Sequence, residues 1–139
     1  MSYEILEHTA DEKFRATGGT LEEAFSEATR ALSEIVGGGE GMYSHDIEIE
    51  SENLEALLFD FLDRLIFLQD TEGVAVSHLE EIEIEEVGEI DDGFSLTATV
   101  LVDTLDAGGS YLDIKAPTYS EMKVDHEDGR WILEAVLDI

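Results

Sequence analysis

Apolar residues recur along the chain at two spacings, and the change between them separates expected helices from expected strands. Residues 21–36 show the helical spacing. Thr20 precedes this run and Glu23 follows three residues later, the arrangement of a capping box. Gly37 comes directly after the run, where a glycine commonly ends a helix. The pattern predicts an amphipathic helix whose apolar positions are Leu21, Ala24, Phe25, Ala28, Ala31, Leu32, Ile35 and Val36.

A second helix is predicted over residues 52–70, and its apolar surface is broader than that of the first. Such a surface is typical of a helix sandwiched within a core. A hydrophobic cofactor slot or a groove for a partner helix is the less favoured alternative. The main face comprises Leu54, Leu57, Leu58, Phe61, Leu65 and Leu68, widened by Phe59, Leu62, Ile66 and Phe67.

The remaining segments alternate apolar and polar residues with the period of two that half-buried strands require. Short turns join several of them, such as "HEDG" at 126–129. No repeat or linker interrupts the chain, so one domain over 1–139 is expected. The element order predicts an α+β fold with two helices packed on mainly antiparallel β-sheet. The predicted strands are 2–8, 12–18, 44–51, 76–87, 94–104, 115–125 and 130–139.

Charge is the outstanding feature of the composition. Thirty-five acidic residues against seven basic ones give a formal net charge of −28. The acids are interleaved with periodic apolar residues, which argues against disorder. A field of this sign repels phosphate backbones, so direct nucleic-acid binding is not expected. An acid-coated domain suited to a salt-rich cytoplasm is favoured over an acidic interaction module.

Several classes of protein find no support in the sequence. There is no cysteine, hence no disulfide framework or cysteine nucleophile. No apolar run is long enough for a membrane span, and the first residues do not resemble a signal peptide, so a cytoplasmic protein is expected. Neither a GxSxG elbow nor a phosphate-binding loop with its Lys-Ser/Thr is present.

Carboxylates near the two ends of the chain are the main candidates for chemistry. Asp11 follows His8 in a turn, and Asp138 precedes Ile139, which carries the α-carboxylate. Taken singly, Asp11 reads as a turn residue and Asp138 as a solvated acid. If the first and last strands are neighbours, the three carboxylates converge, and a hard divalent cation such as Ca²⁺ or Mg²⁺ would relieve their repulsion. Zinc is less favoured, since His8 would be its one nitrogen ligand.

At these residues the chain resembles the archeases. The family's marks are an opening His-Thr-Ala-Asp, a Lys-Ala-x-Thr-Tyr stretch and a terminal Asp-Ile. All three occur here in order, at 8–11, 115–119 and 138–139. The resemblance runs from end to end of the chain and implies an archease-like α+β fold.

The resemblance also implies a function. Archeases are accessory proteins, not ordinary enzymes. They act on the RtcB-type RNA ligase of tRNA splicing, a Mn²⁺- and GTP-dependent protein, by promoting its guanylylation and multiple turnover. Members bind a divalent cation, assigned as calcium, through residues that correspond here to Asp11, Asp138 and Ile139. Ca²⁺ is therefore the expected ion, with Mg²⁺ or Mn²⁺ as alternatives.

Lys115 corresponds to the lysine of the family's second motif. It could orient a phosphate or a ligase acid, or it could simply offset local repulsion. Pro117, Ser120 and Glu121 depart from the usual pattern, which puts a family histidine role in doubt while leaving the metal ligands intact. A metal-dependent hydrolase of nucleotides or RNA, and a general chaperone, remain as alternative functions.

Overall fold

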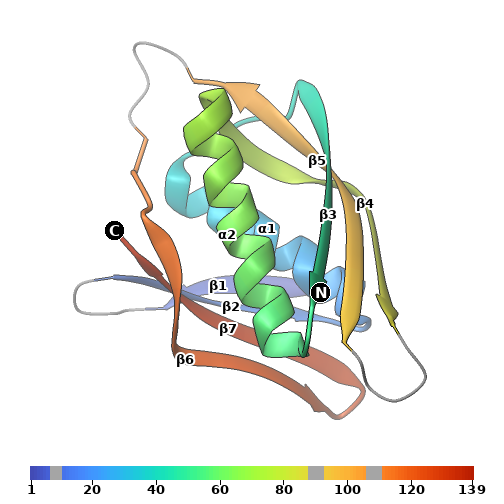
Figure 1. Ribbon diagram of the computed structural model, residues 1–139. Coiled ribbons are helices and arrows are strands. Elements are labelled where there is room, and N and C mark those ends of the chain that lie inside the picture. The colour runs from blue at the N-terminus through green and yellow to red at the C-terminus, as the bar shows by residue number, and fades with distance from the viewer. Residues whose placement is uncertain (7–10, 88–92, 106–110) are drawn as a thin grey trace.

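A computed structural model shows two antiparallel sheets with two helices packed against them (Figure 1). It describes residues 1–6, 11–87, 93–105 and 111–139. The predicted α+β fold with mainly antiparallel sheet is confirmed. Within the described ranges, no helix combines the length and the apolar character needed to cross a membrane.

The first sheet joins the two ends of the chain. Its strand order is β1-β2-β7-β6, with antiparallel pairing throughout. Phe14 and Ala16 of β2 and Leu133 and Ala135 of β7 are buried on the side where the helices pack. The opposite side, turned away from both helices, is called the outer face below. The strands are β1 (Ser2–Leu6), β2 (Glu12–Gly18), β6 (Ala116–Glu127) and β7 (Arg130–Asp138).

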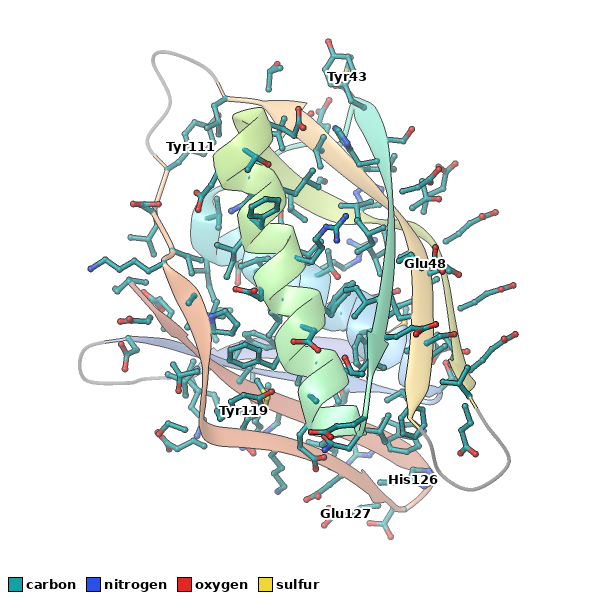
Figure 2. All side chains as sticks on the ribbon, viewed as in Figure 1. Tyr43, Glu48, Tyr111, Tyr119, His126 and Glu127 are labelled. Carbon is teal, nitrogen blue, oxygen red and sulfur yellow. The ribbon has the colours of Figure 1, made fainter. Side chains whose placement is uncertain are left out.

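The second sheet has the order β3-β5-β4 and carries the middle of the chain. Ile47 and Ile49 of β3 are buried, while the acids that alternate with them are exposed. Figure 2 shows one of these acids, Glu48, on the side of the sheet away from the second helix, α2 (Leu54–Glu72). The strands are β3 (Tyr43–Ser51), β4 (Val74–Glu86) and β5 (Phe94–Thr104).

The first helix begins and ends where the local sequence predicts, whereas the second lies two residues later along the chain than the predicted 52–70. Helix α1 (Leu21–Val36) is capped by Thr20, whose hydroxyl accepts from the Glu23 amide at 3.1 Å. In a capping box the Glu23 carboxylate would accept from the Thr20 amide. Here it accepts from the amide of the preceding residue, Gly19, at 2.9 Å. Gly37 adopts a left-handed φ of 93° and ends the helix. Helix α2 (Leu54–Glu72) is capped by Asn53 and Gly73.

Both helices contribute to a hydrophobic core shared with the two sheets. Helix α1 packs between β2 and β4, and Phe25 lies 5.3 Å from Phe61 of α2 between ring centroids. Leu62 and Ile66 are buried as expected, and Phe59 is half-buried. Phe67 is 59% exposed, so its assignment to the core is wrong. The elements that pack on α2 leave this side of its last turns uncovered.

Phe61 and Phe67 offer a matched pair of truncations on one helix. Phe61→Ala should lower the free energy of unfolding by about 3–5 kcal/mol, because the lost ring leaves a cavity in the core. Phe67→Ala should change it by less than about 0.5 kcal/mol, as for most exposed positions. Urea unfolding at fixed salt measures both values. Equal losses for the two variants would contradict this arrangement of α2.

Candidate functional site

The candidate site lies where β2 begins and β7 ends. Glu12 of β2 pairs with Leu137 of β7, in an antiparallel ladder that continues to Gly18 and Trp131. Continuing this register by one residue places Asp11 across from Asp138. It is therefore the second strand of the chain, not the first, that lies beside the last strand. Directly opposite residues in antiparallel strands point to the same face, with Cα atoms about 4.5–5.5 Å apart.

Lys115, from the second family motif, lies at the same place because it directly precedes β6. Ala116 pairs with Asp138, and the Lys115 amide donates to the Asp138 carbonyl at 2.9 Å. The same register sets Lys115 beside Ile139. Figure 1 shows the C-terminus at the end of the sheet where β6 starts. Three segments far apart in sequence therefore meet around Asp138.

The exposure of these residues leaves their polar groups accessible. Asp138 and Lys115 are exposed, Asp11 is partly buried, and Ile139 is 37% exposed. Asp138 has the outward parity predicted for it, opposite to that of the buried Leu137. His8, the remaining candidate, lies outside the described residues.

The donor set suits a hard cation better than a soft one. Asp11, Asp138 and the α-carboxylate of Ile139 offer oxygen atoms only, as Ca²⁺ and Mg²⁺ prefer. Within the described part of the chain, no group of three His, Cys, Asp or Glu side chains gathers closely enough to hold a metal ion. The predicted ligand set differs from such a group because it combines two aspartate side chains with the main-chain carboxylate of Ile139.

Glu134 is a buried carboxylate on the outer face that was not predicted from the sequence. Glu134 on β7 is only 8% exposed. Three bases surround it: Arg15 Nη2 at 3.1 Å, Lys123 Nζ at 3.9 Å and Lys13 Nζ at 4.0 Å. Its carboxylate raises the pKa of the Arg15 guanidinium above the ordinary value. The available signal was Glu134 itself, the one charged residue within the apolar run 131–137.

The same bases shield apolar side chains from water. Ile132 and Val136 point to the outer face, yet they are only 9% and 1% exposed. Long basic side chains lay their methylene stems on such surfaces and keep their charged ends in water. Lys13 lies directly across from Val136. The outer face therefore combines a small apolar layer with a charged network above it.

An irregularity in β6 connects the site to α2. Between Thr118 and Lys123 the β6–β7 register shifts, and Glu121 takes a left-handed φ of 59°. Tyr119, in this bulge, stacks on Phe59 of α2 with ring centroids 4.2 Å apart (Figure 2). Burial, together with the nearby Asp60 and Glu52, raises the pKa of the Tyr119 phenol.

Comparison with known proteins assigns the chain to a protein family. The model of the Archease protein family matches residues 3–139. The chain belongs to the archease family. It is 36% identical to the Protein archease of Pyrococcus abyssi, covering 99% of this chain and 98% of the relative. It is 32% identical to the Protein archease of Methanopyrus kandleri, covering 100% of both chains. Membership of this family is consistent with the prediction of an accessory protein instead of an enzyme.

Solved structures share the archease fold. Protein 1598 of Methanobacterium thermoautotrophicum superposes with a TM-score of 0.83 at 34% identity, covering 99% of both chains. An archease of Thermotoga maritima, described as a possible chaperone, gives 0.64 at 23% identity, covering 96% of this chain and 94% of that one. The second likeness is evidence for the fold alone.

Removing the charge of Glu134 tests the network on the outer face. Glu134→Gln should lower the free energy of unfolding by about 1–3 kcal/mol, since buried hydrogen bonds to charged partners are lost. Glu4→Gln removes the other partner of Arg15, but its side chain is 58% exposed, so a loss below about 1 kcal/mol is expected. Urea unfolding compares the two; a larger loss for Glu4→Gln would refute a central role for Glu134.

Proposed function

We propose that this archease activates an RtcB-type RNA ligase and uses a bound divalent cation to do so. The cation would be held by Asp11, Asp138 and the α-carboxylate of Ile139, with Ca²⁺ as the expected ion. The single observation that carries the proposal is the register of β2 on β7, in which Glu12 pairs with Leu137 and whose extension by one residue would set Asp11 across from Asp138. Membership of the archease family supplies the expected partner.

The surroundings of Asp138 support a role for Lys115 as well. Its main chain is fixed by the hydrogen bond to the Asp138 carbonyl, while the residue remains exposed. An ammonium group carried by a residue next to the proposed cation site can orient a phosphate or a carboxylate of the partner. A divalent cation held there would neutralise charge on phosphoryl oxygens at the ligase active site. The chain's own residues would bind the ion and align the two proteins.

The charge of the molecule also fits this partner. A ligase that binds RNA needs a basic surface, and this chain carries a net charge of −28. Opposite fields accelerate encounter between proteins at low salt. In a salt-rich cytoplasm, which we propose as the setting of this protein, the Debye length falls to about 3 Å at 1 M. Contact geometry at the site would then set specificity.

Asp138→Ala tests the function directly. In a multiple-turnover ligation assay with the cognate ligase, the variant should stimulate at least about tenfold less than the unaltered protein. Mutating even a residue that only supports a metal ligand typically lowers metal affinity or activity by about tenfold or more. Asp63→Ala, which removes the same charge from an exposed position on α2, should stimulate normally. Full stimulation by Asp138→Ala would remove the cation from the mechanism.

The same preparation separates the alternative functions. Incubated alone with Mg²⁺ and GTP or RNA, the protein should leave both intact. Turnover without ligase would favour the hydrolase and contradict the accessory role. Protection of unrelated proteins from aggregation, without ligase stimulation, would favour the chaperone.

Extending the chain beyond Ile139 probes the cation site without changing a side chain. Two added glycines convert the α-carboxylate into a neutral peptide carbonyl and move the negative charge away. Calorimetric affinity for Ca²⁺ should fall by about tenfold or more, as when a metal site loses part of its shell. The same two glycines added before Met1 should have no effect. Unchanged affinity after the C-terminal extension would exclude Ile139 as a ligand.

A further inference from the structure

The seven basic residues of this acidic protein are unevenly distributed. Four of them have outward parity on three adjacent strands of the first sheet. By contrast, exposed acids such as Asp46, Glu48 and Glu50 line the outward positions of β3. The outer face is thus the part of the described surface where cations concentrate. The four bases are Lys13 and Arg15 on β2, Lys123 on β6 and Arg130 on β7.

A cavity of about 530 Å³ opens among these bases. Arg15, Lys123 and Arg130 line it, and Glu4 is the one acid in its wall. The lining therefore carries three positive charges and one negative charge. Ser2 and Thr17 add hydroxyl groups, which lie 2.9 Å apart and bond to each other. Such a lining is unexpected in a protein whose acids outnumber its bases by five to one.

The cations retain donors for a ligand. Arg15 uses Nη1 for Glu4 and Nη2 for Glu134, which leaves other N–H groups of its five. Lys123 pairs with Asp125 at 3.2 Å and with Glu134 at 3.9 Å, and its ammonium has three donors. Arg130 is exposed and makes no ion pair within the described residues. Guanidinium forks match the oxygens of a phosphate group.

The surrounding charge selects the size of the anion. A polyanion would extend past the cavity and meet the acids of the remaining surface. A compact anion would meet the three bases, the hydroxyls and the single acid Glu4, which is already paired with Arg15, and the long-range repulsion would be screened by salt. We propose that this cavity binds a compact phosphorylated small molecule through its phosphate group. The inference is independent of the cation site and of the ligase.

Binding of inorganic pyrophosphate, followed by titration calorimetry, tests the cavity. A chelator is included so that no divalent ion can bring the phosphate to the acids near Asp138. Arg130→Gln and Lys123→Gln should each weaken binding by about tenfold, the effect of losing one charge-assisted hydrogen bond. Arg64→Gln removes the same charge from an exposed position on α2 and should weaken it by less than about twofold. Circular dichroism confirms that each variant folds.

Two further probes identify the source of the phosphate. Tighter binding of adenosine monophosphate than of inorganic phosphate would support a nucleotide, and the reverse order would support free phosphate. An oligonucleotide that binds more tightly as it is lengthened would overturn the compact ligand. Equal affinities for Arg130→Gln, Arg64→Gln and the unaltered protein would overturn the site itself, as would the absence of measurable pyrophosphate binding.

Discussion

The antiparallel pairing of β2 with β7 is the constraint on which the structure depends. It joins segments separated by more than a hundred residues, and it buries Phe14 against the same core as Leu133. Closing so long a loop has an entropic cost, which the apolar contacts on the helix side must exceed. A shift of one residue would turn those apolar side chains to solvent. The core therefore fixes the register, and the register fixes what lies at the end of the ladder.

Both sites follow from that register on the outer face. At one end Glu12 pairs with Leu137, next to Asp11 and Asp138, and further along Arg15 lies across from Glu134. The pairing of β6 on the other side of β7 adds Lys115 at the first position and Lys123 at the second. One face thus carries an acidic zone around Asp138 and a zone around Glu134 where bases predominate. The zones suit ligands of opposite charge, a divalent cation and a compact anion.

Local signals in the sequence predicted the elements well. Thr20, Glu23 and Gly37 define the ends of α1 through contacts made within a few residues. The alternation in β7 predicted correctly that Asp138 faces outward. The residues Asp11, Asp138 and Ile139 could be named from the carboxylates near the two chain ends and from the family pattern. Their convergence was predicted on the condition that the first and last strands are neighbours, whereas it is β2 that pairs with β7.

Features that depend on tertiary contacts were not predictable in the same way. Phe67 satisfies the helical pattern, yet no neighbouring element covers it. The sequence shows Glu134 as an acid within an apolar run, and only the register shows that bases from β2 and β6 converge on it. The β6 bulge at Tyr119 likewise reflects the position of α2, whose Phe59 holds the ring.

Paramagnetic titration with Mn²⁺ would test the cation site most directly, because it can distinguish one specific site from diffuse association with 35 acids. At substoichiometric Mn²⁺, the backbone amide signals of Asp11, Lys115 and Ile139 should broaden first. Signals of the acid-rich β3, including Glu48, should broaden only at higher concentrations. Equal broadening at both places, or earlier broadening on β3, would contradict a cation site where β2 begins and β7 ends.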